Sequence, residues 1–362
     1  MSSRPRVLLF AKYGRKGASS RLRSLQYIPE LEAAGMDVVV SSLFDDRYLH
    51  VLYAEGRRPR LRSIISYFKR LCLLVLSFRY DLIWIEKELF PYVPPFAEWL
   101  LRVLGKPYVV DYDDAVFHNY DLSSRFLVRL LLGKKIDAVM RNASCVVAGN
   151  DYLANRAKAA GAKKIEVIPT VVDVRRYQPR VAQQNKAGAT IGWIGSPSTQ
   201  GYVVDIRNAL TQVTQKHGAK LMLVGATEDV KFEFPNISVE VEPWSEEREV
   251  ELIRTMDVGI MPLKEGPWEK GKCGYKLIQY MACAVPVVAS PVGVNLCIVS
   301  GASCGGLAVT DESWVEQLDR LLASDLLRDE AGKNGRTAVE KTYSMQSQLP
   351  SLVEILFGCC KK

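Results

Sequence analysis

Short runs of aliphatic and β-branched residues alternate with longer amphipathic segments along this chain of 362 residues, and no other feature restricts the fold as much. The runs RVLLFAK, MDVVVSS, YDLIWIEK, PYVVDYD, SCVVAGN and KIEVIP come first. After a polar stretch the pattern resumes with ATIGWIG, KLMLVGA, ISVEVE, DVGIMPL and VPVVAS. Strands regularly separated by helix-length segments predict βαβ units and parallel sheets. The chain is therefore expected to be an α/β protein with two sheets.

The interruption of this pattern divides the chain. Residues 179–189 fall in RRYQPRVAQQNKAGA, whose proline, amide and small residues are typical of a linker. We expect a Rossmann-like domain over 1–178 and a second doubly wound, Rossmann-like domain over 190–341, facing each other across a cleft. Residues 342–362 predict a final helix that crosses back to the first domain.

The two halves differ in charge. Residues 1–180 hold 30 Lys and Arg against 18 Asp and Glu, whereas the rest hold 18 against 22, so the net charges are +12 and −4. The first half is thus the one expected to meet an anionic partner. Eight scattered cysteines without a C-x-x-C pair, and only three histidines, favour reduced thiols and no metal site.

Targeting signals are not evident in the sequence. No apolar stretch approaches the roughly 18 residues of a membrane span, and the N-terminus lacks a signal-peptide pattern. A cytoplasmic protein is expected.

The first candidate site is the loop KYGRKGASSRLRSL, which follows the first strand. In parallel sheets ligands bind beyond the carboxyl ends of the strands, where loops and helix N-termini gather. Gly14 and Gly17 would let the backbone approach a ligand, and Arg21 in the first helical turn would bind a phosphate or carboxylate. The alternative is a surface loop that only connects two elements.

A second loop, VVDYDDAVFHNYD, clusters carboxylates after a strand. Asp113, Asp114 and His118 are the candidates for binding or activating a substrate hydroxyl, because clustered carboxylates have shifted pKa values when they are partly buried. The D-Y-D sequence would also suit a divalent metal, but no other ligand cluster accompanies it, so no metal is expected. A solvated loop that caps the next helix is the plain alternative.

Residues 57–79 contain seven basic residues and no acidic one, and their apolar residues follow helical spacing. Two interpretations stay open. The segment is either a sheet-covering helix with a cationic outer side, or a helix that contacts an anionic membrane surface. A nucleic-acid partner is not expected, because no basic face interleaved with aromatic residues is present.

The second half has its own candidate loops. In IGWIGSPSTQGYV, the residues Gly195, Ser196 and Ser198 lie between a strand and a helix, where they would donate to a phosphate or simply cap the helix.

The loop KEGPWEKGKCGYK follows the strand DVGIMPL and leads into the helix LIQYMACA. It combines backbone donors and ammonium groups for an anion with acceptors for hydroxyl groups. Its candidate residues are Gly271, Lys272, Gly274, Lys276, Glu269 and Gln279. A sugar nucleotide needs both kinds of partner; the alternative is a solvated charged loop.

These segments resemble the retaining glycosyltransferases of the large group 1 class (family 4), which have the GT-B fold. The likeness covers nearly the whole chain in layout and is sharpest from Asp257 to Val294. There, DVGIMPL and KLIQYMACAVPVVASPVG are similar to the family's strand, donor loop, helix and A-x-G-x-P-V-V-A strand. The segment VIPTVVDVRRYQP is similar to the family's I-P-N-G-V-D…F-x-P sequence.

The resemblance implies an activity. The second domain would hold a nucleotide sugar and the first a glycan or lipid-linked acceptor, with retention of anomeric configuration and without an obligatory metal or other cofactor. Such an enzyme would act in surface polysaccharide or glycolipid assembly, in the cytoplasm or at the cytoplasmic face of the membrane. A sugar-nucleotide epimerase of the same architecture and an inactive transferase-like scaffold are the alternatives.

Two family features are altered here. The family's E-x7-E pair falls on Gly271 and Gln279, with Glu269 two residues before the first position. The family's Arg and Lys for the diphosphate are replaced by residues 196–201, SPSTQG.

The diphosphate role then passes to other basic residues. Lys272, Lys276 and Arg21 are the candidates, and we expect removal of either lysine to lower turnover by roughly two orders of magnitude. His118 corresponds only loosely to the histidine found near the catalytic centre of many relatives.

Overall fold

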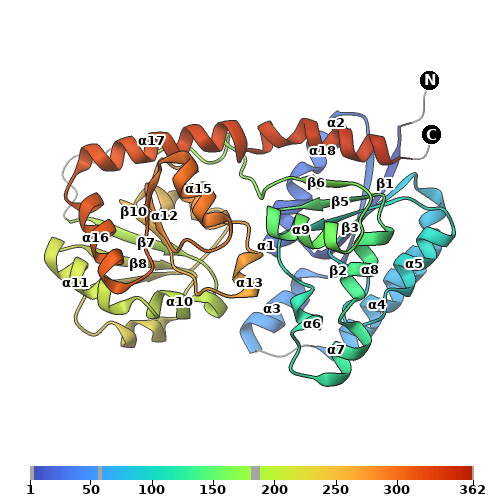
Figure 1. The fold of residues 1–362 in the computed structure, drawn as a ribbon, viewed down its shortest axis with the longest axis horizontal. Helices are drawn as coiled ribbons and strands as arrows, with labels where there is room; N and C mark the ends of the chain where they lie inside the picture. Colours follow the sequence, from blue (N-terminus) through green and yellow to red (C-terminus); the bar gives the residue numbers. More distant parts are fainter. Residues whose placement is uncertain (1–3, 56–58, 181–187, 361–362) are drawn as a thin grey trace. The chain divides into compact units, whose positions relative to one another are not determined.

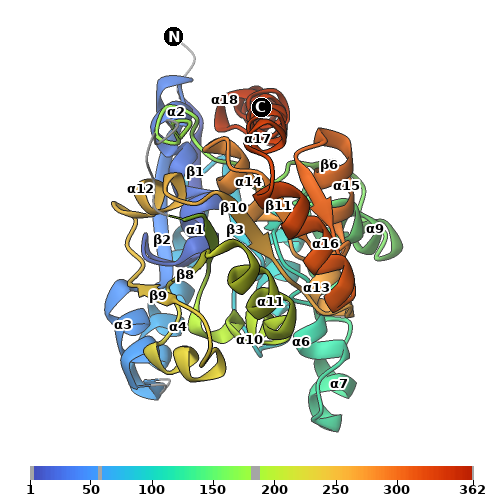
Figure 2. The same ribbon diagram turned by 90° about the vertical axis from the view of Figure 1, so that its left-hand side faces the viewer.

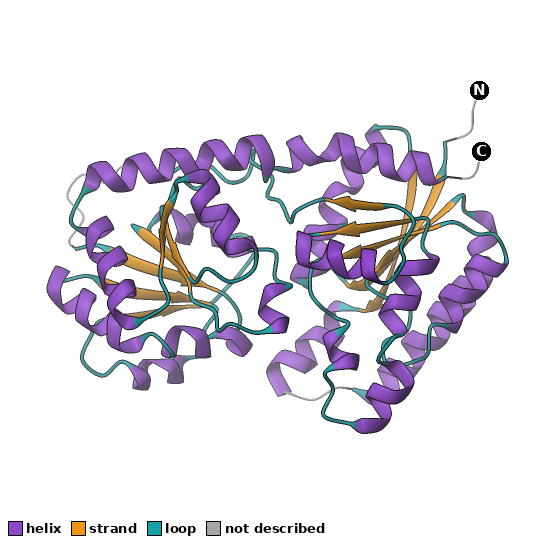
Figure 3. Cartoon of the chain, viewed as in Figure 1, coloured by secondary structure: helices purple, strands orange, loops and turns teal. Residues whose placement is uncertain are grey.

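The computed structural model describes residues 4–55, 59–180 and 188–360. The chain divides into two units, Met1–Thr170 with Gln348–Lys362, and Val171–Ser347. Each unit has a parallel sheet with helices on both of its faces (Figures 1 and 3). Residues 181–187 of the predicted linker and residues 57 and 58 of the basic segment lie outside the described residues.

In the described part of unit 1 the sheet has six strands in the order β2-β1-β3-β4-β5-β6. They are β1 (Arg6–Tyr13), β2 (Asp37–Phe44), β3 (Leu82–Glu86), β4 (Tyr108–Tyr112), β5 (Cys145–Ala148) and β6 (Ile165–Val167). All six strand runs predicted in the first half are confirmed. The residues of β3 and β4 are buried throughout, as expected for a parallel sheet that is covered on both faces.

The helices of unit 1 are mostly short. They are α1 (Ala18–Arg23), α2 (Ile28–Ala33), α3 (Asp46–Glu55), α4 (Arg60–Val75), α5 (Phe96–Val103), α6 (His118–Asp121), α7 (Phe126–Leu132), α8 (Lys135–Asn142) and α9 (Asp151–Ala159), together with most of α18 (Met345–Cys359). The helix-length segment SSRLRSLQYIPELEAAG after the first strand is split between α1 and α2. Pro29 explains the break, because it lacks an N–H and is favoured only in the first turn of a helix, where α2 has it.

In the described part of unit 2 the sheet also has six strands, in the order β12-β11-β10-β7-β8-β9. They are β7 (Thr190–Ile194), β8 (Lys220–Val224), β9 (Val239–Glu242), β10 (Val258–Met261), β11 (Val287–Ala289) and β12 (Gly305–Leu307). The edge strand β12 was not predicted. Its sequence Gly-Gly-Leu has no β-branched residue, and it forms by pairing with β11.

The helices of unit 2 separate into two layers. They are α10 (Gly201–Val204), α11 (Arg207–His217), α12 (Glu249–Arg254), α13 (Pro267–Lys270), α14 (Tyr275–Ala282), α15 (Val294–Ala302), α16 (Asp311–Leu322) and α17 (Asp325–Thr342). Successive residues of β7 point to opposite faces of the sheet. Trp193 packs in the core beneath α11 and α16, and Ile194 packs in the core beneath α14. Figure 2 shows α11 and α16 beside each other.

Each sheet has one point where the strand order reverses. In unit 1 the chain runs from β1 outward to β2 and then returns to β3 on the other side of β1. In unit 2 it runs from β7 outward to β9 and then returns to β10 on the other side of β7. Ligands of such sheets bind beside the carboxyl ends of the strands at this reversal, so the loops there are the places to examine in each unit.

Candidate functional site

Lys276 occupies the strand reversal of unit 2. It lies in the first turn of α14, and its ammonium nitrogen is 4.5 Å from the centroid of the Trp193 ring. A Cβ added to Gly195, just after β7, would lie 3.0 Å from Lys276 Nζ and 2.3 Å from the Trp193 ring. Glycine is therefore what lets the lysine, which follows β10, reach the loop that follows β7.

The surroundings of Lys276 disfavour its charged form. Burial, and then repulsion from the ammonium of Lys272, lower the pKa of Lys276 to about 7. Among the described residues the ammonium forms no ion pair; its partner is the face of the Trp193 ring. A partly buried cation without a carboxylate partner is costly, and an anionic ligand would reduce that cost.

The loop after β7 turns tightly. Residues Pro197–Thr199 form a 3-10 turn, the N–H of Ser196 donates to the Thr199 hydroxyl at 3.4 Å, and the hydroxyls of Ser196 and Ser198 are 2.9 Å apart. Ser198 is exposed and Ser196 half-buried. The serines thus cap a turn, one of the two roles that the sequence left open.

The long loop after β10 is partly helical. We expected an open loop, but Pro267–Lys270 forms α13, because a proline in the first turn favours a helix start. Gly274, directly before α14, has a φ of 65°, and a Cβ there would lie 2.6 Å from Ile298. This left-handed conformation requires glycine, and it sets where α14 begins. Gly271, in the same loop, is buried.

The two expected hydroxyl partners of this loop differ in accessibility. The Glu269 carboxylate is half-buried and accepts a hydrogen bond from the Tyr202 hydroxyl at 2.5 Å. Gln279 is only 3% exposed, and its amide donates to the Tyr177 hydroxyl at 2.9 Å and to Glu249 at 3.4 Å.

The expectation that Gln279 contacts a ligand is therefore corrected: its side chain belongs to the core. A glutamate at this position would bring a second carboxylate against buried Glu249, which like-charge repulsion disfavours.

A cavity of about 320 Å³ opens at the carboxyl ends of β10 and β11 in unit 2. Its walls come from the loops after β10, β11 and β12 and from the region of α10. They include Tyr202, Asp205, Lys264, Glu265, Ser290 and Val292. Its volume lies at the lower end of the range for small-molecule sites, about 300–1,000 Å³.

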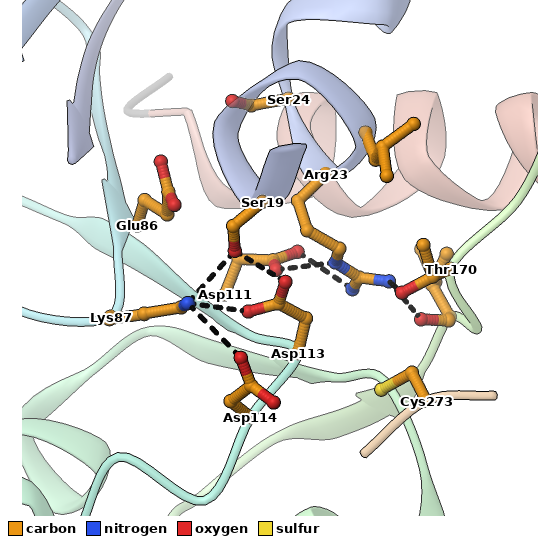
Figure 4. Close-up of polar contacts among 12 residues, drawn as sticks. Ser19, Arg23, Ser24, Glu86, Lys87, Asp111, Asp113, Asp114, Thr170 and Cys273 are labelled. Carbon is orange, nitrogen blue, oxygen red and sulfur yellow. Dashed lines mark hydrogen bonds and ion pairs between the residues drawn. The ribbon is translucent and has the colours of Figure 1, made fainter. Parts of the chain in front are cut away.

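Lys87 occupies the strand reversal of unit 1, and the sequence analysis did not identify it. It follows β3 with a φ of 65°, and 5% of its side chain is exposed. Its ammonium lies 2.8 Å from the Ser19 hydroxyl, 2.8 Å from Asp113 and 3.8 Å from Asp114, as Figure 4 shows. A left-handed lysine is a strained conformation that surrounding contacts must hold in place.

The charges at this place compensate one another. Burial opposes the ammonium of Lys87, but Asp113 and Asp114 more than offset it, so the pKa of Lys87 is raised. Burial likewise opposes the Asp113 carboxylate, yet Lys87 and Arg23 lower its pKa to about 2. Asp113 is thus paired inside unit 1, whereas Asp114, with 32% of its side chain exposed, remains accessible.

A second buried pair lies beside the first. Arg23 in α1 donates to both oxygens of Asp111 at 2.8 and 3.0 Å (Figure 4). It also donates to the carbonyl of Ile168 at 2.8 Å. Burial outweighs the arginine and raises the pKa of Asp111 to about 6. Because the partners lie 88 residues apart, no local pattern in the sequence pointed to this pair.

His118 begins α6 and is held by two neighbours. Its Nδ1 lies 2.8 Å from Asp121 and its Nε2 lies 2.9 Å from the Tyr152 hydroxyl. Both ring nitrogens have partners within unit 1, so the ring is fixed in orientation.

The loop after β1 closes on itself. A Cβ on Gly17 would lie 2.3 Å from Tyr13, and one on Gly14 would lie 2.6 Å from Asp46. Arg21 is buried and donates to the carbonyl of Arg15 in the same loop at 3.2 Å. These glycines are needed for packing, and the arginine turns back onto its own loop, which favours the connecting-loop interpretation.

Helix α4 turns Arg70 and Leu74 toward the interior of unit 1. Arg70 is 1% exposed and donates to the carbonyls of Leu89, Ala11 and Ser41. Burial lowers the pKa of Arg70 to about 9. The outward side exposes the basic residues Arg62 and Lys69 and, beside them, a set of large apolar residues, namely Leu61, Ile64, Ile65, Phe68, Leu71 and Val75. Helix α4 thus covers β2, as the first interpretation has it, and its outer side carries apolar residues as well as basic ones.

Helix α7 also exposes large apolar residues beside basic ones. Its residues Phe126, Leu127, Leu130 and Leu131 are exposed, and Arg125 and Arg129 are exposed beside them. Within the described residues, no helix is both long and apolar enough to span a bilayer. The same residues contain no group of three or more His, Cys, Asp or Glu arranged to hold a metal ion.

The chain resembles known proteins in both sequence and fold. Residues 188–324 match the family model described as "Glycosyl transferases group 1". A comparison with curated protein sequences gives no match.

Solved structures share the whole architecture. Sucrose-phosphate synthase from Thermosynechococcus elongatus has a TM-score of 0.72 at 17% identity, over 98% of this chain and all of that one. WaaG, a glycosyltransferase involved in lipopolysaccharide biosynthesis, has a TM-score of 0.67 at 15% identity, over 98% and 100%. Anabaena Alr3699/HepE in complex with UDP-glucose has a TM-score of 0.65 at 15% identity, over 98% and 99%. Identities this low establish a shared fold.

Proposed function

Residues 188–324 place this chain in the group 1 glycosyltransferases, and on that premise we propose that it transfers a sugar from a nucleotide-sugar donor to a glycan or lipid-linked acceptor. Unit 2 is proposed to hold the donor and unit 1 the acceptor, with retention of anomeric configuration, as the family resemblance implies.

The observation that carries this proposal is Lys276. Its ammonium lies at the strand reversal of unit 2, within reach of the loop after β7, and no carboxylate of the described residues neutralises it. The family places its diphosphate-binding Arg and Lys in that loop, where this chain has SPSTQG. A lysine from α14 that projects toward the same loop supplies the missing charge, with Lys272 as the second cation.

The proposed chemistry follows from that charge. The bond from the anomeric carbon to the diphosphate oxygen breaks, and a bond from that carbon to an acceptor hydroxyl oxygen forms on the same face of the sugar. The departing nucleoside diphosphate takes the bonding electrons, and the hydroxyl loses its proton to a base. Cations placed before the reaction stabilise the departing diphosphate without reorganisation.

The proposed acceptor groups lie in unit 1. Asp114 is half-exposed and is proposed to bind the acceptor hydroxyl and to accept its proton. Asp113 and His118 are held by neighbours and are proposed to position the loop after β4.

The donor site is proposed to include the cavity of unit 2. The other donor contacts are proposed to come from the loop after β10, with Glu269, Gly271 and Gly274, and from the loop after β7, with Gly195, Ser196 and Ser198; of these, Gly195 lies against Lys276. Because the solved Anabaena relative holds UDP-glucose, UDP sugars are the first donors to test.

A peripheral location at the cytoplasmic face of a membrane is part of the proposal. The outward side of α4 is apolar and its exposed charges are basic, including Arg62, Lys69 and, just beyond the helix, Arg79. A helix of this kind lies in the interface of a bilayer with anionic lipids. An enzyme at that surface would meet lipid-linked acceptors, which fits a role in polysaccharide or glycolipid assembly.

The test is an assay of donor turnover. Purified protein is incubated with UDP-glucose, UDP-N-acetylglucosamine or GDP-mannose, with octyl glucoside or octyl glucosyl phosphate as acceptor, and released nucleotide is measured. We expect release that depends on the acceptor, and a product with the anomeric configuration of the donor by NMR. Acceptor-independent turnover would instead support an epimerase, and absence of both turnover and nucleotide binding would support an inactive scaffold.

A further inference from the structure

A cavity of about 560 Å³ lies wholly within unit 1, at the carboxyl ends of β1 and β2. It is larger than the cavity of unit 2 and within the range for small-molecule sites. Its walls are rich in aromatic side chains, namely Tyr13, Phe44, Tyr48, Tyr67, Tyr92 and Tyr120. The sequence analysis identified none of these residues, because they come from five separate segments of the chain.

The aromatic side chains of the walls pack against one another. Phe44 and Tyr48 stack with ring centroids 4.2 Å apart, and Tyr13 and Tyr67 pack against them. Tyr92 meets Tyr120 edge to face at 5.4 Å. Flat apolar surfaces of this kind suit the face of a ring-shaped ligand more than a flexible chain.

Two charged side chains, Lys12 and Glu88, line the cavity. The Lys12 ammonium lies 5.5 Å from the Tyr13 ring centroid, and among the described residues it has no ion pair. The other charged group in the walls, Glu88, is 5% exposed, is paired with buried Lys135 and accepts from the Tyr120 hydroxyl. Lys12 is therefore the one cation in the walls of this cavity, and carboxylates attract it without forming an ion pair with it among the described residues, so its ammonium can pair with a negatively charged ligand.

The cavity adjoins the candidate acceptor groups. Lys12 interacts electrostatically with Lys87, Glu88, Glu86 and Asp113, and its backbone N–H donates to Glu86 at 2.8 Å. A ligand in the cavity is thus next to the cluster around Lys87, to which Asp114 belongs.

The cavity also opens onto an apolar surface. Ile64 of α4 lines the cavity and is at the same time 66% exposed, and Leu61 and Phe68 of the same helix continue the apolar surface outward. Tyr92 at the rim is exposed and has a φ of 58°, a conformation that a tyrosine rarely adopts. Strain of this kind gathers at ligand-binding places.

We propose that this cavity binds the headgroup of a lipid-linked acceptor, namely a sugar ring joined to a lipid through a phosphate. The ring lies against the tyrosines, the phosphate pairs with Lys12, and the lipid tail leaves over Ile64 along α4. This inference rests on the proposed function and names the acceptor class of the same enzyme.

The experiment measures binding without turnover. Octyl glucosyl phosphate has a ring, an anion and a tail; octyl glucoside lacks the anion and glucose 1-phosphate lacks the tail. Each is titrated into the full chain by calorimetry below its critical micelle concentration. We expect octyl glucosyl phosphate to bind at least tenfold more tightly than either of the other two.

Variants locate the binding. Lys12→Met should weaken octyl glucosyl phosphate about tenfold and leave octyl glucoside unchanged, because only the anion is lost as a partner. Tyr92→Gly removes a wall residue while relieving its positive φ, so it should fold normally and weaken both compounds. Lys16→Met, an exposed lysine four residues further on, is the matched control and should bind like the wild type.

The outcomes separate this inference from the proposed function. Equal binding of octyl glucosyl phosphate to wild type, Lys12→Met and Tyr92→Gly would overturn the cavity assignment. Displacement of that compound by UDP would also overturn it, since the cavity would then belong to the donor. UDP binding is measured in the same samples: its absence contradicts the proposed function, and its presence with an unresponsive cavity contradicts only the inference.

Discussion

The two units have the same sheet architecture but treat their charged and apolar side chains in opposite ways. At the strand reversal of unit 1, Lys87 is neutralised by Asp113 and Asp114; at that of unit 2, Lys276 has no carboxylate partner among the described residues. In unit 2 the helices α11 and α16 bury their apolar residues, whereas α4 of unit 1 exposes them. The ion pairs of Lys87 are expected to stabilise the fold of unit 1. The ammonium of Lys276 in unit 2 has no such pair among the described residues and is therefore available to an anionic ligand.

The largest expected effect tests the compensated charge. Lys87→Met leaves the Asp113 carboxylate buried without its cation, and loss of one member of a buried pair costs about 3–5 kcal/mol. Denaturant unfolding should show that loss in the free energy of unfolding. The exposed-lysine variant Lys16→Met should change it by less than about 0.5 kcal/mol. A Lys87→Met protein as stable as the wild type would mean that the pair is not structural.

The same pair predicts how stability changes in acid. The pKa of Asp113 is about 2 in the folded protein, below its ordinary value of 3.8, so the folded state favours the carboxylate. The resulting stabilisation is present above pH 3.8 and is lost as the pH falls through 2. Unfolding free energies measured between pH 5 and 2 should fall less steeply in Lys87→Met than in the wild type.

The next effect tests the uncompensated charge. Lys276→Ala should lower kcat by roughly two orders of magnitude, the scale of losing one preorganised donor to a developing anion. Folding should be intact, because no ion pair is broken. Lys270→Ala is the control on the same loop: Lys270 is bound to Glu265 at 3.0 Å and should be dispensable. Equal activity of the two variants would contradict the role given to Lys276.

A smaller effect concerns pH. Because the pKa of Lys276 is about 7 in the free protein, a bound diphosphate would raise it by favouring the ammonium. UDP affinity should then be constant below pH 7 and fall by up to about tenfold per pH unit above it, as one linked proton requires. Calorimetry from pH 6 to 9 measures this. Lys276→Arg should remove the slope, and a wild-type affinity that is flat above pH 7 would contradict the assignment.

The smallest effect concerns the exposed apolar side of α4. Phe68→Ser should weaken binding to vesicles of phosphatidylcholine and phosphatidylglycerol by about fivefold, which corresponds to about 1 kcal/mol for partial burial of a phenyl ring. Phe232 of unit 2 is 86% exposed and supplies the control, Phe232→Ser, which should bind vesicles like the wild type. Equal weakening by both variants would mean that α4 is not the contact.

Much of the fold followed from local pattern. Eleven of the strands were predicted from the sequence. A strand is indicated by alternating apolar and polar residues or by a short continuous apolar run, and either pattern is complete within a few residues. Only β12 was missed, since its Gly-Gly-Leu sequence carries no such signal. The same regularity put the loops of Lys276, Gly195 and Asp114 at the carboxyl ends of strands, where sites are expected.

The roles of individual side chains followed less well. Gln279 and Arg21 were expected to contact a ligand, yet one joins a buried network and the other binds its own loop. Lys87 and Lys12 were not identified at all. Gln279 and Lys87 depend on partners tens of residues away, Glu249 and Asp113, which no window of sequence contains. Arg21 instead binds a carbonyl six residues away, and only the fold of its loop decides that.

Helix α4 shows where the division lies. The sequence by itself determined that residues 61–75 form a helix with an apolar side and a side of basic and polar residues, because helical periodicity is local. Only the tertiary structure decided which side faces the sheet. Arg70 donates to the carbonyl oxygens of Ala11 in β1, Ser41 in β2 and Leu89 after β3. These bonds hold the Arg70 side of α4 inward and leave Leu61, Ile64 and Phe68 outward.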